Sequence, residues 1–380
     1  MSHAPIYLDH NATTPLHPEI WGVMERIVRL GEPLNPSSLH VYGQRAKALL
    51  AQARALAAES LDVLPQEVLF TSGGTESLNL LIRGLLPPAG GIVLYSAADH
   101  KAITETLRAL EKMGYRGQAL HPDVTGHLSV DQIAGAITPQ VVLMVFSAAN
   151  GETGVLTDVA ALGSLAAWHR IPLVIDAVAL LGKEKVRMLP GVSGLALSAH
   201  KAHGPTGAGL AILRKHLTLR SLHTGGGQEH GRRAGTEALV SWVGAAHAVA
   251  MAQASLVEAA PRMAVLRHRL EEGLRQLYPQ LIVIGENQSR LCNTSCVSFP
   301  GLEGELLVIE LDREGVCVSH GTACSAGAHE LSPALRAMQL PLETIRGSIR
   351  LSLGRFTREE EIDEALIRFQ RVLDRQHARR

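Results

Sequence analysis

The chain has 380 residues, and a typical domain of roughly 150 residues predicts two or three domains, or one large α/β unit with an appendage. Hydrophobic residues make up 46% and charged residues 19%, a balance that excludes intrinsically disordered and fibrous classes. Lys plus Arg (36) equals Asp plus Glu (36), so the net charge is zero and gives no electrostatic footprint for nucleic acid or an anionic membrane. Both partners are therefore disfavoured.

No apolar run reaches the roughly 18 residues of a membrane-spanning helix, because charges such as Asp176 and Lys183 interrupt each candidate. The N-terminal MSHAPIYLDHNATTP has neither the basic nor the apolar region of a secretory signal. We therefore expect a cytoplasmic protein.

Four cysteines occur, and a reducing compartment disfavours a disulfide framework. A zinc site is the competing interpretation, with Cys-x3-Cys and Cys-x6-Cys pairs formed by Cys292, Cys296, Cys317 and Cys324. The first pair lies in a strand-like run and the spacing matches zinc sites poorly, so we expect no metal. Cys292, Cys296 and Cys317 are interpreted as core or strand residues.

Apolar, β-rich segments alternate with helical ones along the first two thirds of the chain. In chain order, the pattern predicts a helix at 44–61, a strand at 68–70, a helix at 75–86, a strand at 90–96, a helix at 102–114, a strand at 141–149, a helix at 158–170, and strands at 171–180, 194–200 and 209–214. This alternation indicates βαβ units and a mostly parallel sheet that is buried on both faces.

The pattern of predicted helices and strands changes after about residue 255. A long charged helix at 257–279 contains Pro261, and short strands are predicted at 281–286, 295–300 and 316–320, followed by two terminal helices. This pattern is typical of a smaller α+β domain. We place the large domain at 15–256, and the small domain at 1–14 and 257–380.

The segment VLFTSGGTESLNLL predicts a strand, a small-residue turn and a helix. Gly73 and Gly74 allow a ligand to approach the backbone, and Thr75 lies where free N–H groups and the positive end of a helix dipole favour a phosphate. A helix N-cap without a ligand is the alternative interpretation.

Asp176 and Lys201 follow two buried strands. The Asp176 carboxylate in LVIDAV needs a cationic or hydrogen-bonded partner, which is either a strand-end ion pair or a ligand. Lys201 in SAHKAHGPTG is surrounded by small residues and is suited to form a Schiff base, although a solvated loop lysine has the same pattern. A phosphate cradle, an Asp and then a Lys together indicate pyridoxal phosphate, whose ring nitrogen prefers a carboxylate and whose aldehyde prefers a lysine.

Two residues of the C-terminal part complete the candidate set. Cys324 lies among small residues in HGTACSAGA, where a thiol on a flexible loop is suited to attack a bound substrate. Arg350 in SIRLSLGRF can bind a carboxylate with both ends of its guanidinium.

These residues resemble the cysteine desulfurase family of the NifS/IscS type, within the class V aminotransferase group of pyridoxal-phosphate enzymes. The resemblance covers nearly the whole chain, through IYLDHNATTP, LNPSSLH, VLFTSGGTES, DHKAI, NGETGV, IDA, SAHK, GGGQEHGRRAGTE, HGTACSA and SIRLSLGRFTREEEI. It implies the type I fold of pyridoxal-phosphate-dependent transferases, with a mostly parallel seven-stranded sheet in the large domain and a smaller α+β domain. It also implies a homodimer.

The resemblance assigns a role to each candidate residue. Lys201 would hold the cofactor covalently and then move protons, Asp176 would keep the ring nitrogen protonated, and His100 would stack on the ring. The phosphate would be held by Gly74, Thr75, Ser198 and His200, with Thr236 of the second subunit. Asn35 and Arg350 would hold the carboxylate of L-cysteine. Cys324 would take the sulfur as a persulfide, leave alanine, and pass the sulfur to an acceptor protein.

Two positions depart from the family pattern. Where the family usually has Asn-Asn-Glu, this chain has Gly151 in place of the second Asn. Where the family has Asp-Ala-x-Gln, this chain has Ala179 in place of the Gln. Both usual donors to the cofactor's O3′ oxygen are therefore missing. Asn150 is a candidate substitute. The chain also ends soon after its last helix, whereas family members that dock an iron-sulfur scaffold often carry a longer tail. The resemblance thus implies sulfur extraction more directly than delivery to that scaffold.

Two other classes of function remain open. One is a related enzyme of the same fold, a selenocysteine lyase or an aminotransferase, in which Cys324 is dispensable. The other is a weakened or non-catalytic paralogue that binds a sulfur acceptor, because Gly151 and Ala179 remove the O3′ donors. The sequence does not distinguish an acceptor in iron-sulfur assembly from one in tRNA or DNA thiolation.

Overall fold

The computed structural model describes residues 4–321 and 331–378. Its central element is a seven-stranded sheet in the order β2-β8-β7-β6-β5-β3-β4. The strands are β2 (Val68–Thr71), β3 (Gly91–Ser96), β4 (Tyr115–Leu120), β5 (Val141–Ser147), β6 (Leu173–Asp176), β7 (Gly194–Ser198) and β8 (Gly209–Leu213). Only β8 runs against the others, because it pairs antiparallel with β2 and β7 while the remaining pairs are parallel. The predicted mostly parallel seven-stranded sheet is confirmed.

The sequence pattern alone located six of these strands. It missed β4, which forms one edge of the sheet and is well buried only at its two end residues, Tyr115 and Leu120, so it lacks the apolar run of its neighbours. The strand expected at 171–180 ends at Asp176, because the chain turns immediately afterwards and the Val178 N–H bonds back to the Asp176 carboxylate.

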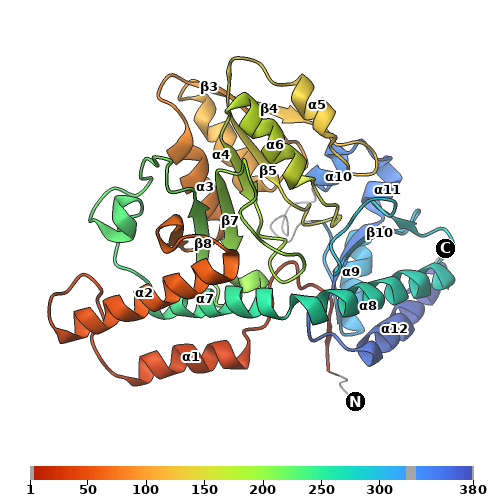
Figure 1. Ribbon diagram of the computed structural model, residues 1–380. Coiled ribbons are helices and arrows are strands. Elements are labelled where there is room, and N and C mark those ends of the chain that lie inside the picture. Colours follow the sequence, from red (N-terminus) through yellow and green to blue (C-terminus); the bar gives the residue numbers. More distant parts are fainter. Residues whose placement is uncertain (1–3, 322–330, 379–380) are drawn as a thin grey trace.

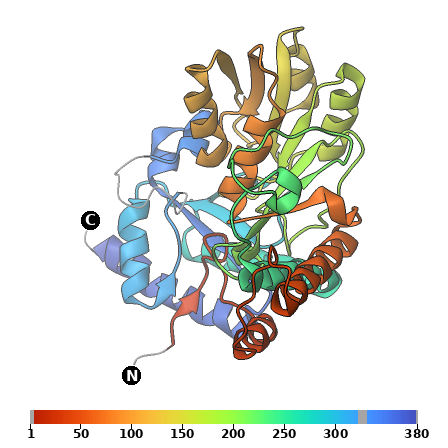
Figure 2. The same cartoon turned by 90° about the vertical axis from the view of Figure 1, so that its left-hand side faces the viewer.

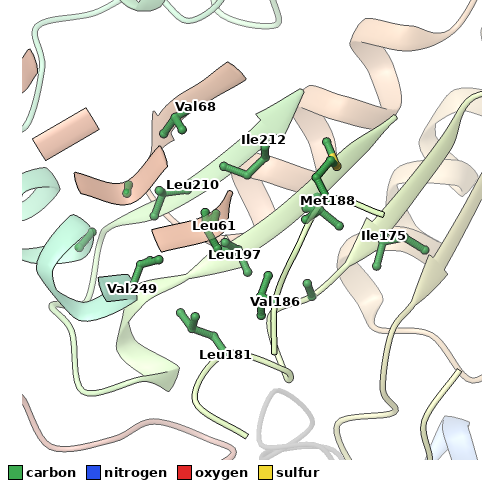
Figure 3. Close-up of a cluster of buried hydrophobic side chains, with 14 of the residues drawn as sticks. Leu61, Val68, Ile175, Leu181, Val186, Met188, Leu197, Leu210, Ile212 and Val249 are labelled. Atoms are coloured by element: carbon green, nitrogen blue, oxygen red, sulfur yellow. The ribbon is translucent and has the colours of Figure 1, made fainter. Parts of the chain in front are cut away.

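Helices cover both faces of the sheet (Figure 1). On one face, α3 (Gly74–Leu85) and α4 (Lys101–Glu111) pack on side chains that include Val174. The other face packs against α1 (Pro18–Arg29), α2 (Val41–Leu61), α5 (Val130–Gly135), α6 (Val159–His169) and α7 (Leu239–Ala254). Figure 3 shows this second core, in which Leu61 of α2 and Val249 of α7 lie over Leu197 and Leu210. Burial on both faces explains the nearly continuous apolar strands.

The C-terminal part has a separate hydrophobic core. Its elements are α8 (Leu256–Leu277), β9 (Ile282–Val283), β10 (Thr294–Ser298), α9 (Gly304–Arg313), β11 (Val316–Cys317), α10 (Pro333–Ala337), α11 (Leu342–Arg346), β12 (Ser348–Ser352) and α12 (Glu359–Ala378). A three-stranded antiparallel sheet has the order β12-β10-β9, and β11 pairs parallel with β1 (Ile6–Tyr7). Figure 2 shows the N-terminal strand among these elements, and Ile6 and Leu8 belong to their core. The exact domain limits stay a prediction.

Within the described residues, no single helix is both long and apolar enough to cross a membrane. The pair α7 and α8 reaches the required length and composition only together, across a 71° bend, and α7 is largely buried in the core.

An ion pair anchors the long segment after β8 to the sheet edge. Arg54 of α2 donates from Nη1 to Glu229 Oε2 at 2.8 Å, and the same oxygen accepts from the Phe70 N–H of β2 at 2.8 Å. The Glu229 side chain is fully buried and that of Arg54 is 11% exposed. Among the described residues, Arg54 is the one partner that forms an ion pair with Glu229, so the segment that carries Thr236 depends on this pair.

We predict that Arg54→Ala lowers the free energy of unfolding by about 3–5 kcal/mol, because removing one partner leaves the Glu229 carboxylate buried and uncompensated. Urea denaturation followed by circular dichroism measures this loss. Arg29→Ala, which breaks an exposed pair with Glu25, is the control and should change stability by at most about 1 kcal/mol. Equal losses in both variants would contradict the prediction.

Candidate active site

The sheet topology gathers the candidate residues at one edge. Strands β2, β3, β5, β6 and β7 point the same way, and open α/β sheets bind ligands outside the carboxyl ends of their strands. The residues that follow these five strands are Gly73 to Thr75, His100, Asn150, Asp176 and Lys201. Residues more than 100 positions apart in the chain therefore share one edge.

The turn before α3 is built for a close approach. Gly73 has a φ of +155° and caps the helix without a side-chain hydrogen bond, so side chains of the cap do not occupy the first N–H groups of α3. A Cβ on Gly74 would lie 2.6 Å from Val178 Cγ2, and the hydroxyl of Ser198 is 3.8 Å from the place of a Cβ on Gly73. A backbone cradle beside a buried serine suits a phosphate.

Asp176 and His100 form the electrostatic centre of this edge. The Asp176 carboxylate is buried and accepts the Val178 N–H at 2.9 Å, and burial raises its pKa while His100 and Lys201 oppose the rise. His100 is the N-cap of α4, where its Nδ1 accepts the Ala102 N–H at 3.0 Å. Burial lowers the pKa of His100, which favours the neutral ring.

The N-terminal segment passes beside Lys201. Lys201 Nζ donates to the Asn11 carbonyl at 2.6 Å, and the His200 carbonyl accepts from the Thr14 hydroxyl at 2.7 Å. Burial, with Lys201 next in importance, lowers the pKa of His200 to about 4. His200 is therefore neutral near pH 7 and offers a hydrogen bond rather than a charge.

Arg350 of β12 reaches the same edge from the C-terminal part. Its Nη2 donates to Asp9 Oδ1 at 2.6 Å and its Nη1 to the Gly151 carbonyl at 3.3 Å, while its Nε is buried without a partner among residues 4–321 and 331–378. Glu152 Oε1 is also buried without a partner. A substrate carboxylate would therefore meet a guanidinium that is already held in place.

Asn35 and Thr236 are the two remaining candidates among the described residues. Asn35 is exposed, its Oδ1 accepts the Ser37 N–H, and the connection between α1 and α2 lies at the opposite side of Figure 1 from α10 and α12. One chain thus does not bring Asn35 to Arg350, and their shared role stays a prediction. Thr236 is exposed, and Cys324 lies outside the described residues.

Sequence reasoning missed three residues at this edge. Asn11 offers its carbonyl to Lys201, Lys183 donates to the Lys201 carbonyl at 2.6 Å, and Asp99 accepts the N–H groups of Ser96 and Ser147. Burial raises the pKa of Asp99 to about 7. The available signal for Asp99 and Asn11 was a polar residue in the turn that follows a strand, and the signal for Lys183 was a lysine at the end of an apolar run.

Comparisons with known proteins agree with this geometry. Residues 6–365 match the family model described as aminotransferase class-V. A protein named cysteine desulfurase 2 from Trichormus variabilis is 37% identical over 98% of this chain and 94% of its own length, and a cysteine desulfurase from Cereibacter sphaeroides is 40% identical over 95% and 94%. The chain belongs to the cysteine desulfurase family. A solved structure titled NifS-like protein superimposes with a TM-score of 0.91 at 31% identity, over 97% of this chain and 99% of that one.

The two departures from the usual sequence of this desulfurase family have different surroundings. A Cβ on Gly151 would meet nothing within 4 Å, so a larger side chain fits there. Ala179 is partly buried in the turn after β6. Asn150 is held in the turn, because one N–H of its Nδ2 donates to the Ala98 carbonyl and its Oδ1 accepts the N–H groups of Glu152 and Thr153. The second N–H of Nδ2 is the donor that it could offer to a ligand, so its role as a substitute stays a prediction.

The three described cysteines of this desulfurase are unreactive thiols. Burial raises the pKa of Cys292 to about 11, and it also raises the pKa of Cys296 and of Cys317. The thiolate is the nucleophile, so none of the three is activated at neutral pH. Among residues 4–321 and 331–378, no group of three or more His, Cys, Asp or Glu side chains is arranged to hold a metal ion.

We predict that His10 and His203 each lower the stability of this desulfurase as the pH falls from about 6.5 to about 4. Burial lowers the pKa of His10 and of His203 to about 4, whereas the unfolded chain protonates each near 6.5. The unfolded state therefore binds more protons in this window, at a cost of up to about 1.4 kcal/mol per pH unit for each histidine.

His10→Asn should make this fall shallower, as measured by urea denaturation at several pH values, because it removes one of the two titrations. His216 is exposed, and His216→Asn should keep the wild-type slope. Identical slopes in His10→Asn and the wild type would show that His10 does not titrate with folding.

Proposed function

We propose that this protein removes sulfur from L-cysteine, leaves L-alanine, and carries the sulfur as a persulfide on Cys324 to an acceptor protein. The observation that supports this most strongly is the meeting of Lys201, Asp176 and His100 with the uncapped start of α3 at one edge of the sheet. The relatives reported above carry the name cysteine desulfurase, which supports the same substrate.

The class-V aminotransferase and cysteine desulfurase families depend on pyridoxal phosphate, and the described residues fit it. The N–H groups at Gly74 and Thr75, with Ser198 and His200, would hold the phosphate, and the buried Asp176 carboxylate would hold a proton at the ring nitrogen. When bound, the cofactor withdraws electrons from the substrate's α-carbon and so permits the C–S bond to break.

Protein groups then position the substrate and move protons. Lys201 Nζ, next to the Asn11 carbonyl, would take and return the proton at the α-carbon, and neutral His100 would accept the proton of the substrate thiol. Arg350, fixed by Asp9, would orient the substrate carboxylate through its unpartnered Nε. Asn35 would bind the same carboxylate only if it came from a second subunit rather than from the chain that carries Arg350.

Sulfur transfer to Cys324 balances without an added oxidant. The Cys324 thiolate forms an S–S bond with the substrate sulfur as the substrate's C–S bond breaks, and protonation at carbon gives alanine. The enzyme thiol and L-cysteine thus become an enzyme persulfide and L-alanine. The unreactive state of Cys292, Cys296 and Cys317 supports Cys324 as the nucleophile.

A homodimer is part of this proposal. Apolar side chains are exposed on α1 and at the start of α2, with Trp21 53%, Val28 64%, Leu39 91% and Val41 63% exposed. They lie near an apolar groove between α1, α2 and α7 that includes Val23, Ile27 and Val243. Exposed apolar patches of this kind are typical of protein interfaces, and a second subunit would bring Thr236 to the phosphate.

We predict that the cofactor-loaded protein releases alanine and an equal amount of sulfide from L-cysteine in the presence of a thiol reductant. Cys324→Ala should reduce both to background and form no persulfide, yet bind the cofactor normally. Cys317→Ala is the matched control and should keep full activity, since Cys317 is a partly buried thiol with a raised pKa.

The other outcomes identify the alternatives. Full turnover by Cys324→Ala would refute the assigned nucleophile, and a keto acid or alanine without persulfide would indicate an aminotransferase or a lyase of the same fold. A wild-type protein that binds no cofactor would indicate a non-catalytic paralogue. Incubation of the persulfide form with purified acceptor proteins of iron-sulfur assembly and of tRNA or DNA thiolation would show which of them takes the sulfur.

We predict that Gly151→Asn and Ala179→Gln each tighten pyridoxal phosphate binding. Each restores a donor to a charged oxygen, which is worth about 1.5–3 kcal/mol, or roughly 10-fold to 100-fold in affinity. Gly151→Asn adds its side chain to open space and keeps the backbone carbonyl. Gly135→Asn, at the exposed end of α5 where a Cβ also meets nothing, is the control, and fluorescence titration gives the dissociation constants. Unchanged affinity in both restored variants would refute this explanation.

A further inference from the structure

Lys183 is a buried lysine without an acidic partner. Its side chain is 5% exposed, and its neighbours in the chain, Leu181 and Val186, belong to the core shown in Figure 3. Within residues 4–321 and 331–378, Lys183 forms no ion pair. Burying an ammonium group without a counter-ion is costly, so this lysine does not contribute to stability through its charge.

The ammonium group of Lys183 points at the residue proposed to carry the cofactor. Lys183 Nζ donates to the Lys201 carbonyl at 2.6 Å, and the Lys183 carbonyl in turn accepts the Cys292 thiol at 3.4 Å. Both lysines also line a small pocket of about 20 Å³ with His10, His203 and Arg355. That pocket wall is basic and contains no carboxylate.

We propose that Lys183 is a positioning residue for Lys201, which fixes the Lys201 backbone and places a second positive charge behind its side chain. An amine must be neutral to attack a carbonyl, and a nearby cation favours the neutral form of a lysine. The Asp176 carboxylate acts in the opposite direction from the other side. This inference rests on the proposed function of Lys201.

The electrostatics of the surrounding groups agree with this role. Burial and then the charge of Lys201 lower the pKa of Lys183 to about 7, so Lys183 carries its charge below about pH 7. In that range its charge favours the neutral form of Lys201, because Coulomb coupling between two groups is mutual. Charged and titratable groups face the two lysines from every neighbouring element, namely His10, His100, Asp176, His200, His203, Cys292 and Arg355. Burial keeps each of the four histidines largely neutral near pH 7, so they do not replace the Lys183 charge.

The test measures how fast pyridoxal phosphate becomes attached to Lys201 at different pH values. Borohydride traps the attached cofactor, and peptide mass spectrometry identifies and quantifies the modified lysine. In Lys183→Met the pH midpoint of this rate should rise, and attachment below about pH 7, where Lys183 is charged in the wild type, should be up to roughly tenfold slower. Lys183→Arg, which keeps the charge and can extend into the adjacent pocket, should return the midpoint towards the wild-type value.

Two further variants separate charge from structure. Lys183→Gln keeps a donor for the Lys201 carbonyl without a charge, so it should raise the pH midpoint as Lys183→Met does. It replaces Lys183→Met in the test if the Met variant does not fold. Lys185→Met, two residues away and exposed, should leave the midpoint unchanged. Circular dichroism establishes that each variant is folded.

The outcomes distinguish this inference from the proposed function. If the wild-type protein attaches no cofactor at Lys201, the proposed function fails. If the wild type attaches it and folded Lys183→Gln or Lys183→Met keeps the wild-type midpoint, only the role of Lys183 is refuted.

Discussion

The buried carboxylate of Asp176 is the constraint on which this site depends. It lies at the end of β6 with one backbone N–H as its hydrogen-bond donor, and its position between β5 and β7 keeps water away. Such a charge is tolerable only next to cationic or hydrogen-bonding groups. The elements on either side supply them, His100 from the start of α4 and Lys201 from the turn after β7. The opposing charges are therefore positioned by the sheet rather than by flexible side chains.

The second requirement is a connection between the two hydrophobic cores. The segment after β1 supplies it, because Asn11 contacts Lys201 through its carbonyl and Thr294 of β10 through its amide, while Asp9 holds Arg350. This segment leaves the C-terminal core and then passes the sheet edge, so it joins Arg350 and Lys201 in one hydrogen-bonded arrangement. Preorganisation of this kind lowers the cost of orienting a substrate.

The sequence predicted those parts that depend on local pattern. Continuous apolar runs gave the central strands, and polar residues directly after them, Asp176 and Lys201, gave the centre of the site. What it could not give depends on contacts between distant segments. The edge strand β4 is defined by its pairing with β3 and not by an apolar sequence. In the sequence Lys183 looks like an ordinary charged residue, and only the fold shows that it contacts the Lys201 carbonyl. The role of Asn35 stays a prediction, because one chain does not bring it to Arg350.

Gly151 shows why the lost donors need not disturb the fold. Its carbonyl accepts from both the Asn11 amide and Arg350, so the backbone at this position joins the N-terminal segment to β12 whatever side chain it carries. Asn150, by contrast, is committed through both ends of its side chain to the Ala98 carbonyl and to the turn. On the proposed function, a change from asparagine to glycine at 151 would remove a contact to the cofactor and would keep the contacts of the backbone carbonyl. The change would then alter cofactor affinity and the reaction rate. It would leave the stability of the fold unchanged, because residue 151 contributes to the fold through its main chain.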